Sequence, residues 1–361
     1  MQKSAHIFRL ILLLATMALC LPSQGQNIIF NHLTTDEGLS QFSVNGLYID
    51  ENGVLWIGTR EGLNRYNGVD IQTYKLRKND PYSIFCNSVL RITGNGKGKI
   101  YLLCTEGVAE FDMSTEKFTT LIQGGNIGCV YYSNYTNALY IGMGSEIYRY
   151  NEKTGNFDLN AQLAGNSPEI SCLYRQDDKV WVGTFNDGLY MYKLTSPESA
   201  RQILKRGNIS DIYEDSDGEL WVGSWEEGLY RIRPDGSVSN YRNEARNEHS
   251  LSSNFVRACC EDNTGRIWIG TFTGLNSFDK QTGLFQRYTA DNREDNGLTH
   301  SSIWCIEKDQ QGTLWLGTYF GGVNYFNPEY EIYTRYTWSE TPGQGLSNPV
   351  VGRMAEDRSG G

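Results

Sequence analysis

Residues 55–59 of this chain read Leu-Trp-Ile-Gly-Thr, and close copies of that pentapeptide recur along the sequence. An aromatic residue at the second position marks each copy, and an apolar residue follows it. Five copies are strong and two are weak, and their aromatic anchors lie at positions 56, 101, 140, 181, 221, 268 and 315. The mean spacing is about 43 residues, which is typical of the blade of a β-propeller.

Each copy stands inside a larger repeat. An Asp-x-x-Gly turn precedes four of the copies, beginning at Asp50, Asp215, Asp262 and Asp309. Asp at the first position and Gly at the fourth suit a type I turn in a short hairpin. A Gly-Leu pair follows most copies, as at residues 62–63, and another short stretch comes after it, as at residues 71–74. Each repeat therefore predicts four short strands joined by tight turns.

The anchor strand explains why these small sheets must stack on one another. Residues 55–57 are apolar at consecutive positions, so both faces of this strand must be buried. In a propeller each blade lies between two neighbours, and this arrangement buries both faces. We therefore predict an all-β fold, a β-propeller of seven four-stranded blades, with the start of a further repeat at the C-terminus.

The chain divides into three parts. Residues 1–25 carry a short positively charged segment and then an uncharged apolar run, and they are typical of a secretory signal peptide. Residues 26–337 hold about seven propeller repeats, and residues 338–361 begin an eighth repeat that is truncated. Residues 28–30 look like a fourth strand that closes the ring, while residues 332–334 compete for the same role. We expect the chain to be a fragment of a longer protein.

Net charge and cysteine content narrow the range of partners. The formal net charge is −10 and the isoelectric point is near 5.0, so we expect no binding of nucleic acid by this region. Seven cysteines follow the signal segment, an odd number with no Cys-x-x-Cys spacing. Adjacent Cys259 and Cys260 cannot form an ordinary unstrained bridge. We interpret the thiols as buried apolar groups, although an exported protein permits disulfides.

The repeated Asp turn, the Leu-Trp-Ile-Gly-Thr anchor and the Gly-Leu-x-x-Tyr strand together resemble the two-component regulator propeller repeat. The resemblance covers nearly all of residues 28–361, although the second repeat has Cys104 where Gly-Thr is expected and the third lacks the Asp turn. It implies the exported, periplasmic sensory region of a hybrid sensor histidine kinase. The partners that it implies are an oligosaccharide ligand, a following propeller and the kinase regions of the parent chain, and it leaves a homodimer open.

Residues with catalytic or metal-binding chemistry are few. His32, His249 and His300 lie at no metal-ligand spacing from another His or Cys, so we predict no metal site and no cofactor. A Ser follows two of these histidines, but Ser is an ordinary turn residue. Residues 215–219 lack the distal acid of a calcium loop, and the Gly-rich residues 94–98 lead into a strand rather than a helix. We predict no catalytic residue in this chain.

One recurring turn carries unusual residues. Four residues after the anchor, between the second and third strands, four of the repeats have a large aromatic side chain. In a propeller these turns share a face with the loops that lead to the innermost strands, where ligands commonly bind, and aromatic rings stack on sugars. The candidate ligand-binding residues are Arg60, Phe185, Trp225, Phe272 and Tyr319. The alternative is that these rings pack on neighbouring loops or on a second propeller.

Three functions are consistent with these features. The leading hypothesis is a sensory propeller of a hybrid two-component kinase that binds carbohydrate or transmits its binding. The second is a secreted binding or scaffold propeller with no kinase attached. The third is a carbohydrate-active propeller enzyme. Turnover of a glycan would favour the third hypothesis, whereas saturable binding without turnover would leave the first two.

Overall fold

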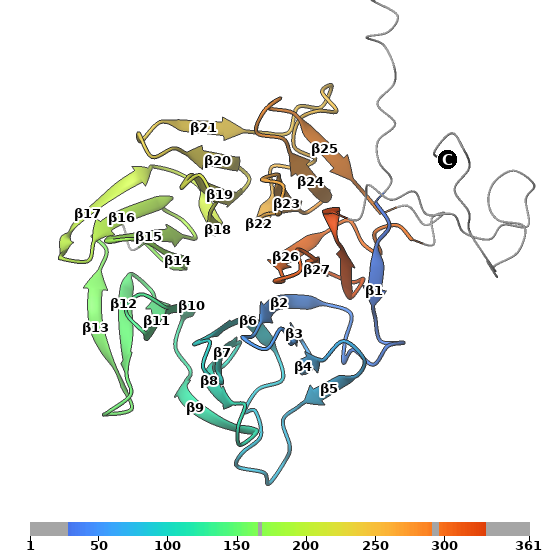
Figure 1. Cartoon of the computed structure of the whole chain (residues 1–361). Helices are drawn as coiled ribbons and strands as arrows, with labels where there is room; N and C mark the ends of the chain where they lie inside the picture. Colours follow the sequence, from blue (N-terminus) through green and yellow to red (C-terminus); the bar gives the residue numbers. More distant parts are fainter. Residues whose placement is uncertain (1–27, 165–167, 291–295, 330–361) are drawn as a thin grey trace, which may run out of the picture.

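The computed structural model describes residues 28–164, 168–290 and 296–329. In this part of the chain 28 strands form seven antiparallel sheets of four strands each, arranged in a ring (Figure 1). The seven-bladed propeller predicted from the repeats is thus confirmed. The described residues contain no helix long and apolar enough to cross a membrane. The predicted signal segment at residues 1–25 and the predicted eighth repeat at residues 338–361 lie outside the described residues.

The first four blades follow one another in chain order, and in each blade the first strand is innermost. Blade one consists of β2 (Val44–Ile49), β3 (Leu55–Thr59), β4 (Gly62–Tyr66) and β5 (Ile71–Tyr74). Blade two consists of β6 (Val89–Gly94), β7 (Lys99–Cys104), β8 (Gly107–Asp112) and β9 (Lys117–Gln123). Blade three consists of β10 (Ile127–Ser133), β11 (Ala138–Met143), β12 (Glu146–Asn151) and β13 (Asn156–Gln162). Blade four consists of β14 (Ile170–Gln176), β15 (Lys179–Thr184), β16 (Leu189–Lys193) and β17 (Ser196–Leu204).

The last three blades complete the ring, and the seventh borrows its outermost strand from the start of the chain. Blade five consists of β18 (Asn208–Glu214), β19 (Leu220–Trp225), β20 (Gly228–Ile232) and β21 (Val238–Tyr241). Blade six consists of β22 (Val256–Glu261), β23 (Ile267–Thr271), β24 (Gly274–Phe278) and β25 (Phe285–Tyr288). Blade seven consists of β26 (Ile303–Lys308), β27 (Leu314–Thr318), β28 (Val323–Phe326) and β1 (Asn31–Leu33).

Burial follows the position of a strand within its blade. The anchor strands β3 and β23 are buried at all five of their positions, as expected for a strand with a blade on either side. The outermost strand β21 has no fully buried residue, because its far edge faces solvent. The core is therefore a ring of apolar layers between adjacent blades rather than a single centre.

The Asp-x-x-Gly turn is tied to the anchor Trp by side-chain hydrogen bonds. In blade six, Oδ1 of Asp262 accepts hydrogen bonds from the backbone N–H groups of Thr264 and Arg266, at 2.8 and 3.1 Å. Its other oxygen accepts the Trp268 indole N–H at 2.7 Å. Blades one, five and seven repeat the bond from Trp to Asp at 2.8–3.0 Å. One carboxylate thus fixes both the turn and the buried ring.

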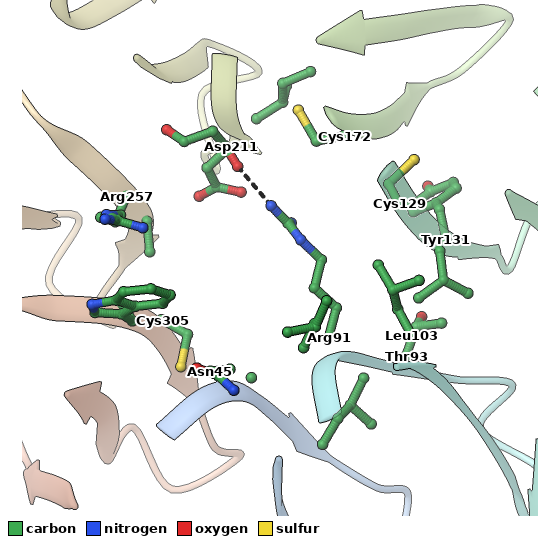
Figure 2. Close-up of a pocket in the computed structure, with 18 of the residues that line it drawn as sticks. Asn45, Arg91, Thr93, Leu103, Cys129, Tyr131, Cys172, Asp211, Arg257 and Cys305 are labelled. Carbon is green, nitrogen blue, oxygen red and sulfur yellow. Dashed lines mark hydrogen bonds between the residues drawn. The ribbon is translucent and has the colours of Figure 1, made fainter. Parts of the chain in front are cut away.

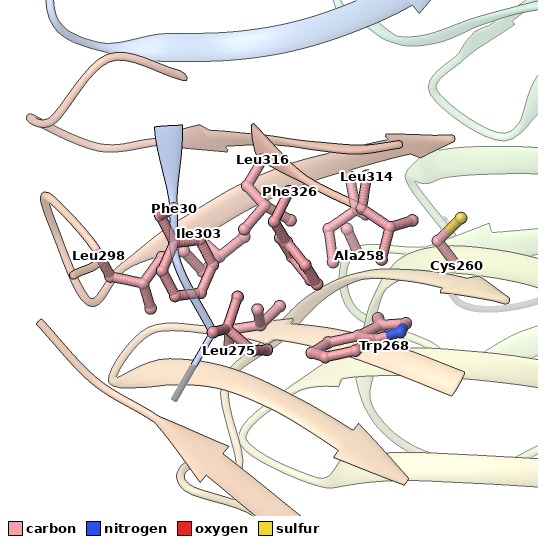
Figure 3. Packing of buried hydrophobic residues seen from close by; sticks show 12 residues of the cluster. Phe30, Ala258, Cys260, Trp268, Leu275, Leu298, Ile303, Leu314, Leu316 and Phe326 are labelled. Carbon is pink, nitrogen blue, oxygen red and sulfur yellow. The ribbon is translucent and has the colours of Figure 1, made fainter. Parts of the chain in front are cut away.

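The ring closes through β1, which pairs antiparallel with β28. The sequence offered residues 28–30 as one candidate for this strand, whereas the structure places it at residues 31–33. Residues 28 and 30 mimic a strand because they are buried for another reason: they lead into β1 through the core between blades six and seven. There the Phe30 ring lies 5.1 Å from the ring of Phe326 (Figure 3). The competing residues 332–334 lie outside the described residues.

Every innermost strand carries a β-bulge near its start, where one extra residue stands between two register partners. A bulge redirects the side chain at that point. The seven bulge residues are Asn45, Leu90, Gly128, Ser171, Ser210, Arg257 and Trp304. They surround one end of the ring axis, and this end of the axis carries the candidate site.

Candidate functional site

The innermost strands of all seven blades enclose a central channel with a volume of about 570 Å³ (Figure 2). Along the middle of the channel, each innermost strand contributes to the lining the residue that follows its bulge. Five of these residues are small, so the channel stays open: Gly46, Cys129, Cys172, Ala258 and Cys305. The other two are Arg91 and Asp211.

Arg91 spans the channel. Its guanidinium donates a hydrogen bond of 3.1 Å to the backbone oxygen of Ser210, on the far side of the ring (Figure 2). The side chain therefore links blade two to blade five and divides the channel between its two ends. Asp211 stands beside that contact, and its carboxylate accepts a hydrogen bond of 2.9 Å from the backbone N–H of Cys259.

Burial controls protonation in the channel. It raises the pKa of Asp211, although the backbone N–H of Cys259 and the charge of Arg91 act in the opposite direction. Burial, and after it the neighbouring Asp211, raise the pKa of Glu307 to about 8, so this carboxyl group is mainly protonated at pH 7. Burial also raises the pKa of the Cys172 thiol to about 12. The channel thus contains no reactive thiolate among these groups at neutral pH.

A series of cations and aromatic rings in contact with one another runs around one mouth of the channel. The Arg257 guanidinium lies 3.9 Å from the ring centre of Trp225 and 4.1 Å from that of Trp304. Trp304 stacks on Tyr319, with ring centres 5.3 Å apart and planes 12° from parallel. The Arg60 guanidinium lies at the other end of the series, over the Tyr319 ring and 5.4 Å from its centre. We call these five residues the mouth series.

Three of the five sequence-predicted residues thus come together in the mouth series, namely Arg60, Trp225 and Tyr319. Phe185 lines the channel with Trp225 and is 44% exposed, so a ligand could reach its ring. Phe272 does not line the channel, and its nearest aromatic partner is Phe255, with ring centres 6.2 Å apart. The structure therefore divides the predicted set. Four of these residues lie at or beside the mouth, and one packs away from it.

The acidic residues beside these rings already have partners. The Asp187 carboxylate accepts hydrogen bonds from Tyr190 and Gln202, at 2.5 and 3.0 Å. Glu227 forms an ion pair with Arg242. These contacts leave both acids less free to form hydrogen bonds with a ligand.

Sequence reasoning missed Arg257, Trp304 and Arg91. The first two occupy the bulge position of their blades, and the third follows it. The sequence did contain a signal for them. A recurring apolar residue starts each innermost strand, and Arg257 and Trp304 lie one residue after it, whereas Arg91 lies two residues after it. Most blades carry a small or polar residue at the bulge, so Arg and Trp stand out once the repeats are aligned.

Groups suited to metal binding or to nucleophilic catalysis do not gather elsewhere in the described part of the chain. No cluster of three or more His, Cys, Asp or Glu side chains with the geometry of a metal site occurs among these residues. The Ser250 hydroxyl donates to the backbone oxygen of Asn247 at 2.8 Å. Nδ1 of His300 accepts the backbone N–H of Ser302 at 3.0 Å. Both residues therefore have local structural contacts in their loops.

Comparison with known proteins shows which repeat family these repeats resemble. Four stretches of the chain match the family described as two component regulator propeller: residues 38–61, 203–226, 250–273 and 297–320. A curated relative, histidine kinase P4 from Formosa agariphila, is 39% identical over 71 residues. That match covers 20% of this chain and 5% of the kinase.

Solved structures share the fold at low sequence identity. The extracellular domain of a putative hybrid two component system from B. thetaiotaomicron superposes with a TM-score of 0.74 at 21% identity, covering 92% of this chain and 46% of that one. A second such domain from the same organism gives 0.67 at 20% identity, covering 82% and 39%. Streptogramin B lyase gives 0.64 at 13% identity, covering 83% of this chain and 97% of the lyase.

This chain spans less than half of both extracellular domains. Likeness at this level of identity establishes the fold alone, as its extension to a lyase makes clear. The repeat matches are more specific, since they cover the Asp turn and the anchor strand in four blades. The chain is a seven-bladed β-propeller in which four blades carry the two component regulator propeller repeat.

Proposed function

We propose that this chain is an exported sensory propeller of a hybrid two-component receptor, and that it binds an oligosaccharide at the mouth series. The repeat family and the extracellular domains that share the fold support the sensory role. On this proposal the chain itself is not an enzyme, and the kinase regions of a longer parent chain receive the signal.

One observation carries the ligand half of the proposal. Four aromatic rings lie at the mouth of the channel, and Phe185 and Trp225 line it directly. Ring faces beside a cavity suit the apolar faces of sugars, and an oligosaccharide gains contact there without needing charge. Binding can drive signalling only if the two states of the receptor bind the ligand with different affinity.

The test is a titration of the purified chain with oligosaccharides of two to eight sugars from plant and algal polysaccharides, followed by calorimetry. We expect saturable binding without turnover, and a loss of affinity of about ten-fold in Phe185→Ala and in Trp225→Ala. Tyr135→Ala is a matched control. Its ring contacts Arg175 at 3.6 Å, in a cation–aromatic pair in the hairpin turn at the opposite face.

Equal affinity of all three variants would refute the proposed site. Hydrolysis of an oligosaccharide by the wild-type chain would favour an enzyme instead. The signalling half has its own test, because the coding sequence after codon 361 should continue into further repeats, an apolar segment of about 20 residues and a kinase region. A stop codon after one or two more repeats would make this a free exported propeller.

A further inference from the structure

Two cations at the channel form no ion pair within the described residues. Arg91 and Arg257 both line the cavity, and neither forms an ion pair with any residue in the described ranges. Arg91 at least donates a hydrogen bond to a backbone oxygen. Arg257 instead lies between the faces of Trp225 and Trp304. Arg257 is half-buried, so its guanidinium has lost part of its hydration, and an anion would offset that loss.

Two unused hydrogen-bond donors lie close together at Arg257. Its Nε and the indole nitrogen of Trp304 are buried and lack a hydrogen-bond partner among the described residues. The Arg257 guanidinium lies 4.1 Å from the centre of the Trp304 ring, and both residues line the channel. Buried donors are nearly always paired in folded proteins, so these two point to a missing acceptor.

The acids in the channel do not neutralise these cations. Four charged side chains line the cavity, namely Arg91, Asp211, Arg257 and Glu307. Burial lowers the pKa of Arg257 to about 10, and the neighbouring charge that adds to this effect is the cation of Arg91. Glu307 is mainly neutral at pH 7, because its pKa is raised to about 8. The two guanidinium groups thus face at most one ionised carboxylate, that of Asp211.

We infer that the channel mouth is a site for a carboxylate-bearing sugar, with Arg257 between Trp225 and Trp304 as the group that receives the carboxylate. This inference rests on the proposed function and narrows its ligand class to acidic oligosaccharides built from uronic acids. A planar carboxylate matches the guanidinium geometry in two parallel hydrogen bonds. The Trp304 indole N–H supplies a further donor, and the ring faces contact the sugar.

The test uses single sugars, because they separate the charge from the rest of a ligand. Thermal unfolding of the purified chain is followed with 50 mM glucuronate, 50 mM glucose or sodium chloride at equal ionic strength. We expect glucuronate alone to raise the Tm, by about 3 °C if its dissociation constant is near 5 mM. Arg257→Gln should abolish that shift, whereas Arg242→Gln, a surface arginine paired with Glu227, should keep it.

Two further readouts separate carboxylate binding from a purely stabilising role of Arg257 and from sulfate binding. If Arg257 served stability alone, Arg257→Gln would unfold at a lower temperature, whereas removal of an uncompensated buried charge should leave the Tm unchanged or raise it. A shift by sodium sulfate at matched ionic strength, without one by glucuronate, would overturn the carboxylate assignment in favour of a sulfate ester. No shift by glucuronate beyond that of chloride would overturn the inference outright. That result would not exclude binding of neutral oligosaccharides, so the proposed function would still be decided by the oligosaccharide titration.

Discussion

The bond between the turn carboxylate and the anchor indole makes a quantitative prediction. In Asp262→Asn, one oxygen can still accept the two backbone N–H groups of the turn, at present 2.8 and 3.1 Å away. The new amide N–H₂ then faces the indole N–H of Trp268, donor against donor, where a bond of 2.7 Å stood. If the amide flips, its N–H₂ group instead faces the two backbone N–H donors of the turn. No orientation satisfies the site, so the buried indole N–H loses its partner.

The magnitude follows from the kind of bond that is lost. Trp268 is fully buried, and its partner is a carboxylate, so the bond is charge-assisted. Loss of such a partner costs about 2–3 kcal/mol. At about 2 °C per kcal/mol for a domain of this size, the Tm should fall by about 5 °C. Differential scanning calorimetry on the purified chain measures this directly.

Asp235→Asn is the matched control, because Asp235 caps an exposed turn through the backbone N–H of Ser237 and binds no indole. Its Tm should stay within error of the wild type. Blade four gives an independent comparison, since its anchor Trp181 has a buried indole N–H without a hydrogen-bond partner among the described residues. Trp268→Phe should therefore cost about 2 kcal/mol more than Trp181→Phe. Equal Tm values for Asp262→Asn and Asp235→Asn would refute the reasoning.

Three further predictions concern the channel and the contacts between blades. Gly128→Ala should destabilise the fold by more than about 2 kcal/mol in urea unfolding, because its Cβ would lie 1.8 Å from the backbone oxygen of Ile170. The stability of the wild type relative to Glu307→Gln should fall, by on the order of 3 kcal/mol, as pH rises from 5 to 8, since the folded chain keeps a proton that the unfolded chain releases near 4.5. Alkylation of Cys86 by iodoacetamide should show a pKa well below that of an ordinary thiol, lowered mainly by its hydrogen bond with Cys104, and Cys104→Ala should raise that midpoint.

Each of these has an outcome that would contradict it. An unchanged urea midpoint for Gly128→Ala would mean that blades three and four can separate at no cost. Parallel pH profiles for the wild type and Glu307→Gln would mean that channel water keeps this carboxyl group near its ordinary pKa. An alkylation midpoint near 9 for Cys86 in the wild type would mean that the two thiols do not share a proton.

The fold was predictable because its information is repeated. Seven aromatic anchors gave the number of blades, and consecutive apolar residues such as 55–57 gave the burial of both faces. The predicted closing strand lies three residues before the observed one, because the prediction there depended only on the pattern of apolar residues. Ile28 and Phe30 are buried by the neighbouring blade, whereas β1 itself carries the polar residues Asn31 and His32 at the outer edge. Hydrophobic pattern alone cannot separate a strand from a buried lead-in segment.

The candidate site was only partly predictable, for a different reason. The turn position of Phe185 and Trp225 was visible because aromatic residues are unusual in turns. The partner of the Trp225 ring, Arg257, comes from the innermost strand of the neighbouring blade, so their proximity depends on how blades are arranged around the axis. Phe272 shares the same turn position and still lies away from the channel lining. Position in the repeat therefore gives the face of the propeller but not the distance to its axis.

The bulge position shows how repetition can hide a site. In blades one, four and five the bulge side chain donates to a backbone oxygen at the start of the next blade's innermost strand, in the bonds from Asn45 to Val89, Ser171 to Ile209 and Ser210 to Val256. These bonds link adjacent blades. Arg257 Nε and the Trp304 indole nitrogen make no such bond within the described ranges, and they stay unpaired at the channel mouth. Two adjacent blades have thus given up a bond that would stabilise the ring. That loss is understandable if binding a ligand, rather than joining blades, determines which residues stand there.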